Sequence, residues 1–267
     1  MPEEIIYEIA GGVARVTINR PERRNSITWG VMTGLRQCLA RAKADPGVKV
    51  VVLTGAGDRA FCAGADLGGM APARGDGDAS GGFVAQHDSR GELARLFDDM
   101  WRLGKPTIAR VRGYALAGGF GLALACDMVI AADDAIFGTP EVDRGLWPFM
   151  ITVPLARSMP PKKALELMLS GRRVDAVEAD RLGFVTRVVP VSDLDSATDE
   201  LAANLATKPP GVVKLGRDSF YEVWDQPAAS ALAHLHSMLT ITTMTEDAAE
   251  GIAAFTEKRA PRWKAGT

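Results

Sequence analysis

The sequence predicts an α/β protein in which an α/β core is followed by a helical C-terminal portion. In the first 150 residues, runs rich in β-branched residues alternate with apolar patterns of helical spacing. After about residue 150 the strand signals thin out and helical segments dominate. The chain has 267 residues, 47% of them hydrophobic, which is enough to bury a substantial core without disulfides or metals.

The first half of the chain supplies most of the expected strands. Residues 4–10 and 13–19 predict a hairpin, because the second run alternates at period two and Gly11-Gly12 separates the two. Further strands are expected where apolar and β-branched residues run together, at residues 48–54, 107–111 and 128–131. Helices are expected where apolar residues recur at helical spacing, at about residues 28–44, 89–103 and 122–126.

The second half is expected to be mainly helical, with one short strand at residues 185–189. Its expected helices are at residues 162–169, 176–182, 194–206, 212–223, 231–244 and 247–259. We therefore predict two parts, an α/β core over residues 1–195 and a helical region over residues 196–267.

Composition and charge exclude several kinds of function. The 31 Lys and Arg against 33 Asp and Glu give a net charge of −2, so no basic surplus would attract nucleic acid or an anionic membrane. No apolar run approaches the roughly 18 residues of a membrane span, and the acidic N-terminus lacks the apolar core of a signal peptide. The three cysteines and three histidines show no spacing typical of a disulfide framework or a metal site. We expect a cytoplasmic protein without a metal.

Three glycine-rich turns are the main candidates for a functional site. They cover residues 61–67, 113–119 and 137–141, and the last continues to Pro148. Glycine lets a ligand approach backbone N–H groups closely. Two such groups that converge would form an oxyanion hole, which stabilises a thioester carbonyl as it becomes an enolate by about 3–4 kcal/mol per donor. The alternative is that each glycine only permits a tight turn. The sequence contains neither a G-x-G-x-x-G after the first strand nor a G-x-S-x-G elbow.

In order and spacing, these turns and their flanking segments resemble the crotonase superfamily, the enoyl-CoA hydratases and isomerases. The matching stretches are Asn19-Arg20-Pro21 with Asn25, FCAGADL, KPTIARVRGYALAGG, LACDMVIA, FGTPE, residues 183–190 and the terminal EGIAAFTEKR. Together they cover the chain from about residue 4 to residue 260. A single stretch would be weak evidence for the family, whereas the ordered set of stretches is specific to it.

The resemblance implies a spiral of ββα units with a helical C-terminal trimerisation region, assembled as a homotrimer or a dimer of trimers. It also implies an acyl-CoA substrate, with coenzyme A as part of that substrate and no separate cofactor. The enolate would be held by the backbone N–H groups of Ala65 and Gly118. Substrate-binding positions carried over from the family are Arg24 and Ser26 with Arg23 beside CoA, Ala63, Asp66 and Leu67 in the first turn, and Phe255 and Lys258 closing over CoA. For the arginines, plain surface charge is an equally good interpretation.

The acid–base residues decide the reaction. Hydratases of the family carry one glutamate three residues after the oxyanion glycine and a second in the later Pro-Glu pair. Here the second is Glu141, but Gly121 stands at the position of the first. The hydratase pattern then continues as IPGxGG, whereas this chain has Trp147 and Phe149 there. These two side chains are expected to narrow or reshape the acyl pocket, or else to pack in the core.

A single glutamate favours isomerisation, because one carboxylate can take a proton from C2 and return it at C4. The isomerases of the family likewise lack the first glutamate. Three alternatives stay open: a hydratase with Asp143 or Asp66 as the substitute base, another crotonase reaction such as thioester hydrolysis, decarboxylation or C–C cleavage, and a non-catalytic acyl-CoA binder. Residues 68–88, rich in Gly, Asp and Ala, are expected to form a mobile surface loop or lid.

Overall fold

Two sheets organise the α/β core in the computed structural model, which describes residues 3–66, 84, 87–88 and 90–263. The strands of the larger sheet, in spatial order, are β1 (Ile5–Ala10), β2 (Val13–Ile18), β3 (Val50–Gly55), β5 (Thr107–Val111), β7 (Met128–Ala132) and β10 (Arg187–Val189). β1 runs antiparallel to β2, and all other neighbours are parallel.

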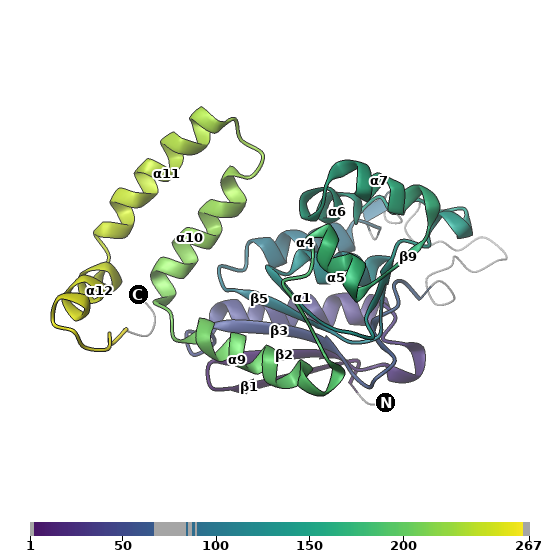
Figure 1. Cartoon of the computed structure of the whole chain (residues 1–267), viewed down its shortest axis with the longest axis horizontal. Helices are drawn as coiled ribbons and strands as arrows, with labels where there is room; N and C mark the ends of the chain where they lie inside the picture. Colours follow the sequence, from purple (N-terminus) through teal and green to yellow (C-terminus); the bar gives the residue numbers. More distant parts are fainter. Residues whose placement is uncertain (1–2, 67–83, 85–86, 89, 264–267) are drawn as a thin grey trace.

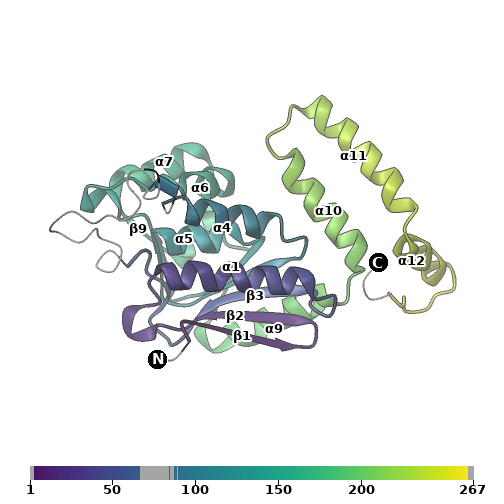
Figure 2. The ribbon, with the colours of Figure 1, turned by 180° about the vertical axis from the view of Figure 1, so that it is seen from behind.

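Helices cover both faces of the larger sheet, so β3 is buried along its whole length. The covering helices are α1 (Trp29–Ala44), α4 (Glu92–Trp101), α5 (Gly118–Ala125) and α9 (Leu194–Ala206). Val51 and Leu53 belong to the apolar cluster shared with α1, α4 and α5, whereas Val50 and Val52 belong to the cluster shared with α9. Accordingly, α9 lies in front of the sheet in Figure 1 and α1 lies in front of it in Figure 2.

The smaller sheet was missed by the sequence analysis. Its strands, in spatial order, are β4 (Ala60–Cys62), β6 (Tyr114–Leu116), β8 (Ile136–Gly138) and β9 (Arg173–Asp175). β4, β6 and β8 are parallel, and β9 is antiparallel to β8. Each has three residues, which is too short to display an alternating pattern. The expectation of only one strand after residue 150 is therefore wrong, because β9 lies there in addition to β10.

Most other predicted elements are present with small changes at their ends. Thr28 caps α1 by accepting a hydrogen bond from the Val31 N–H at 3.0 Å. The strand predicted at residues 107–111 is β5. The helix expected from residue 122 begins four residues earlier, at Gly118. The low helix propensity of glycine hid this start in the sequence. Burial of all eight residues of α5 stabilises the helix.

The remaining described helices lie at the edge of the core or leave it. They are α6 (Thr152–Ser158), α7 (Pro161–Ser170), α8 (Ala176–Leu182), α10 (Pro210–Val223), α11 (Ala228–Thr243) and α12 (Glu246–Thr256), with the short 3₁₀ turns η1 (Pro21–Arg23), η2 (Val142–Arg144) and η3 (Val191–Asp193). Helices α10, α11 and α12 extend away from the sheets (Figure 1). The α/β core with a helical C-terminal portion is thus confirmed. The division at residues 195 and 196 stays a prediction; it falls inside α9, which packs on the larger sheet.

A salt bridge joins α10 to the core, in addition to the ion pair between Arg157 of α6 and Asp225 in the loop after α10. Arg217 of α10 donates from Nε to Asp127 Oδ2 at 2.8 Å, and its other nitrogens donate to the carbonyls of Trp101 and Met100, both at 2.8 Å. Tyr221 Oη donates to the second oxygen of Asp127. None of the helices in the described part of the chain has the length and apolar content needed to cross a lipid bilayer.

Candidate active site

The three glycine-rich turns leave one edge of the smaller sheet. The turn that contains Ala65 follows β4, the turn that contains Gly118 follows β6, and the turn that contains Glu141 follows β8. Because β4, β6 and β8 are parallel neighbours, their carboxyl ends meet at the same edge. Ligands of parallel α/β sheets bind outside such an edge. The structure therefore brings together three segments that are far apart in sequence.

The first two turns touch each other. Gly64 has a φ of +92°, and a Cβ added to it would lie 2.6 Å from the Ala117 Cβ and 3.6 Å from the Gly118 nitrogen. Only glycine fits so close an approach at that φ. Ala117 itself has a positive φ of 51°, and its N–H donates to the Gly138 carbonyl at 2.9 Å. Residue 117 thus anchors the second turn to the strand that precedes Glu141.

Among the described residues, neither the Ala65 N–H nor the Gly118 N–H donates a hydrogen bond within its own local structure. Ala65 forms a parallel bridge with Ile27, in which the Ile27 N–H donates to Gly64 and the Ile27 carbonyl accepts from Asp66. The Ala65 N–H therefore faces away from Ile27. Gly118 is the first residue of α5, and the first N–H groups of a helix have no partner within it. Both groups suit the binding of an anionic oxygen.

Glu141 immediately precedes η2, at the end of the third turn. Among the described residues, its Oε2 atom is buried and has no hydrogen-bond partner. Burial raises the pKa of the Glu141 carboxyl, while its own backbone N–H and the nearby charge of Arg144 oppose this rise. The Arg144 guanidinium is held beside it by donation to the Pro140 carbonyl at 2.9 Å. A partly dehydrated carboxyl with a raised pKa is suited to the role of a general acid or base.

A network around Arg20 holds the first turn, and the sequence analysis assigned Arg20 no role. Its guanidinium donates to the Ser26 carbonyl at 2.8 Å, the Ser26 Oγ at 3.0 Å and the Asp66 Oδ2 at 3.2 Å. The fully buried Asn25 accepts from the Arg20 N–H at 3.0 Å. Ser26 and Asp66, which the sequence places beside the substrate, are thus also members of a structural network. In the sequence, Arg20 and Asn25 were noted only because they belong to a stretch that matches the crotonase superfamily.

The other predicted substrate-binding residues lie in different surroundings. Ala63 donates its N–H to the Arg24 carbonyl at 3.0 Å, and the side chains of Arg24 and Arg23 are exposed. Trp147 packs against the core, whereas Phe149 is 70% exposed. Leu67 lies outside the described residues, as does most of the segment predicted to be a lid.

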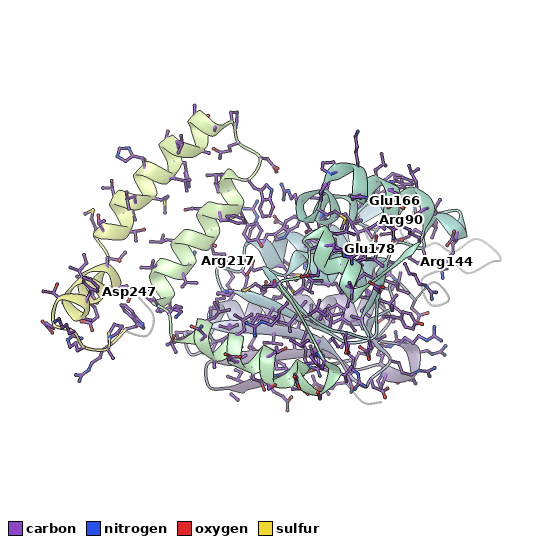
Figure 3. The ribbon with its side chains drawn as sticks, viewed as in Figure 1. Arg90, Arg144, Glu166, Glu178, Arg217 and Asp247 are labelled. Atoms are coloured by element: carbon purple, nitrogen blue, oxygen red, sulfur yellow. The ribbon has the colours of Figure 1, made fainter. Side chains whose placement is uncertain are left out.

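Phe255 and Lys258 are not near Glu141 within one chain. Phe255 is 87% exposed on α12, and Lys258 follows that helix. Figure 3 shows Asp247, at the start of α12, and Arg144, next to the third turn, at opposite ends of the molecule. Of the two aspartates considered as substitute bases, Asp66 is paired with Arg20, and Asp143 lies beside Gly171, where an added Cβ would be 2.9 Å from its Oδ2.

A sequence model for the family described as enoyl-CoA hydratase/isomerase matches residues 8–266. The chain belongs to this family. A probable enoyl-CoA hydratase of Mycobacterium tuberculosis is 35% identical over 263 residues, covering 98% of each chain. The carnitinyl-CoA dehydratase of Proteus mirabilis is also 35% identical, over 275 residues and 99% of each chain. The predicted resemblance to the crotonase superfamily is confirmed.

The fold agrees with this family as well. The crystal structure of an enoyl-CoA hydratase from Mycobacterium smegmatis superposes with a TM-score of 0.90 at 31% identity, covering 97% of this chain and 98% of that one. The protein is therefore an enzyme of the hydratase/isomerase family with its fold. Gly121, which stands at the position of the first glutamate in the two-glutamate pattern, lies within α5, three residues after Gly118.

Proposed function

We propose that the protein moves the double bond of a β,γ-unsaturated acyl-CoA to the α,β position, with Glu141 as its single acid/base. The observation that carries this proposal is the carboxyl group of Glu141. Its Oε2 atom is buried and has no hydrogen-bond partner among the described residues, and Gly121 has no carboxyl group where the two-glutamate pattern has its other acid. The names of the relatives, an enoyl-CoA hydratase and a carnitinyl-CoA dehydratase, support an acyl-CoA substrate.

The reaction needs one proton to leave one carbon and return to another. The Glu141 carboxylate takes the proton from C2, and the electrons of that C–H bond shift toward the thioester oxygen to give a dienolate. The Ala65 and Gly118 N–H groups stabilise the negative oxygen, by about 3–4 kcal/mol for each donor. Glu141 then returns the proton to C4, so the C3–C4 double bond becomes a C2–C3 double bond. No water is consumed.

The positions that the family resemblance assigns to CoA binding do not lie together in one chain. Arg24 is exposed beside the first turn, whereas Phe255 lies on α12 and Lys258 just after it, in the part of the chain that extends away from the sheets (Figure 1). We therefore propose that α12 of a second subunit closes over CoA in a homotrimer or a dimer of trimers. Large apolar side chains left exposed on α11 and α12 support an assembly; they include Leu232 (67%), Leu239 (64%) and Ile252 (66%).

Hydration is the second candidate, and the names of the relatives, a hydratase and a dehydratase, favour it. It would require another group to activate water. Asp143 is the nearest carboxylate in sequence to Glu141, and it is exposed. Product analysis distinguishes the candidates, because hydration of crotonyl-CoA consumes the conjugated double bond whereas isomerisation of 3-hexenoyl-CoA creates one.

The decisive experiment replaces Glu141 by glutamine. Steady-state turnover of 3-hexenoyl-CoA and crotonyl-CoA is measured for the wild type, Glu141→Gln and Asp143→Asn. We expect the wild type to isomerise the first ester, and Glu141→Gln to lose at least about 100-fold in kcat, as for removal of a general base. Binding of the CoA ester should remain. If Glu141→Gln kept full activity and Asp143→Asn lost it, Asp143 rather than Glu141 would be the acid/base.

A further inference from the structure

Gly121 lies where three helices meet. A Cβ added to it would be 2.3 Å from Ile151 Cγ2 and 2.8 Å from Phe97 Cζ. Phe97 belongs to α4, Gly121 to α5, and Ile151 precedes α6. Both neighbours are only 2% exposed. Carbon atoms do not approach this closely without a shift of the surrounding structure, so no side chain fits at position 121.

Helix α5 has little freedom to move aside. Two positions before Gly121, a Cβ on Gly119 would be 2.2 Å from the Cys62 carbonyl oxygen of β4. At the first residue of the helix, a Cβ on Gly118 would be 3.2 Å from Ile27 Cδ1. The helix is therefore in close contact on several sides, and a shift away from Ile151 would drive it into the first turn.

A further departure from the hydratase pattern, at Ile151, lies against Gly121. When the proline of IPGxGG is placed on Pro148, the pattern has glycine at the position of Ile151. The chain thus has a glycine where the pattern has a glutamate, and an isoleucine where the pattern has a glycine. The isoleucine at position 151 fills the volume that the glycine at position 121 leaves empty. A packed core tolerates such volume-conserving pairs of changes best.

We propose that Ile151, supported by Phe97, is a reaction-determining residue: it fills the space of a second carboxylate and keeps the site to one-carboxylate chemistry. This inference rests on the proposed function of Glu141. In hydration, one carboxylate takes a proton from water while the water oxygen bonds to C3, and another carboxylic acid gives a proton to C2. An isoleucine in place of the second group neither holds water nor transfers a proton.

The test is a double-mutant cycle of Gly121→Glu, Ile151→Gly and both together. Gly216→Glu is the matched control, because Gly216 also lies within a helix but has nothing within 4 Å of its added Cβ. Two quantities are measured for each variant: the thermal midpoint, and the ratio of crotonyl-CoA hydration to 3-hexenoyl-CoA isomerisation. The thermal midpoint needs no substrate, so it tests the packing independently of the reaction.

We expect Gly121→Glu to lower the thermal midpoint strongly, and Gly216→Glu to leave it nearly unchanged. The double variant should melt well above the value obtained by adding the two single shifts. Its hydration-to-isomerisation ratio should rise by about 100-fold, the contribution of one added acid/base, while Ile151→Gly alone changes this ratio little. If Ile151 had only a structural role, adding Ile151→Gly to Gly121→Glu would restore the thermal midpoint without changing the hydration-to-isomerisation ratio.

Additive midpoint shifts would overturn the packing argument, and an unchanged ratio in a folded double variant would overturn the reaction-determining role. If the glutamate variants do not fold, the pair Gly121→Ala and Ile151→Ala gives the same coupling test with a smaller side chain. Failure of the proposed function looks different: the wild type would not isomerise 3-hexenoyl-CoA, whereas the coupling between residues 121 and 151 would persist.

Discussion

Replacing the buried Asn25 by alanine should destabilise the protein and disturb the turn that carries Ala65. The Asn25 Nδ2 donates to the carbonyls of Ala56 at 2.9 Å and Ala60 at 2.7 Å, and its Oδ1 accepts from the Arg20 N–H at 3.0 Å. The residue is fully buried and has a φ of +55°. Asparagine tolerates this left-handed conformation better than alanine does.

The magnitude follows from these contacts. Three hydrogen bonds at about 1 kcal/mol each give a loss of about 3 kcal/mol. Forcing alanine into the left-handed region adds about 1 kcal/mol. The free energy of unfolding should therefore fall by about 4 kcal/mol, which lowers the thermal midpoint of a chain of this size by about 10 °C.

Thermal unfolding followed by circular dichroism measures the effect. Asn25→Gly is the matched control, since glycine accepts the positive φ but makes none of the three side-chain bonds. We expect it to lose about 3 kcal/mol, slightly less than alanine, because only the bonds are removed. A midpoint shift below about 2 °C for Asn25→Ala would refute the reasoning, because buried polar groups left without partners cannot be that inexpensive.

Three further predictions concern charged groups. Because burial raises the pKa of Glu141, the acidic limb of kcat/KM should lie above the ordinary glutamate value of about 4.3. The raised folded-state pKa also means that stability is lost as pH rises through it. Glu141→Gln should therefore gain stability relative to the wild type as the pH rises above the ordinary glutamate pKa of about 4.3, and parallel midpoint-against-pH curves would contradict this. Asp127→Ala should lower the free energy of unfolding, measured by urea denaturation, by about 3–5 kcal/mol. The change leaves the charge of Arg217, whose side chain is 8% exposed, without its carboxylate partner. Asp127→Asn should cost less, and equal losses for both would argue against a charge effect.

The larger sheet could be predicted from the sequence, whereas the smaller one could not. β3 and β5 are apolar, β-branched runs of five or six residues, and such runs are long enough to be recognised. The strands of the smaller sheet have three residues each and are defined by their neighbours rather than by their own pattern. The second half of the chain was read correctly as mainly helical because its helices are longer and periodic.

The parts of the candidate site that lie in local sequence motifs could be predicted from the sequence. The glycines of the turns were found from their place after expected strands, and Glu141 was found from the resemblance to the crotonase superfamily. The structure adds that the strands before these turns are neighbours. Ile151 and Phe97 were not singled out, since isolated apolar residues resemble any other part of the core. Their contact with Gly121 depends on how α4, α5 and α6 converge, which no local pattern records.

The small size of the strands beneath the turns bears on the order in which the molecule forms and opens. Each three-residue strand offers few hydrogen bonds and pairs with segments distant along the chain, so it gains stability only after the larger sheet and its helices are in place. Under mild denaturant, the edge that carries Ala65, Gly118 and Glu141 should therefore exchange its amide protons before the larger sheet does. Loss of activity would then precede loss of helical circular dichroism.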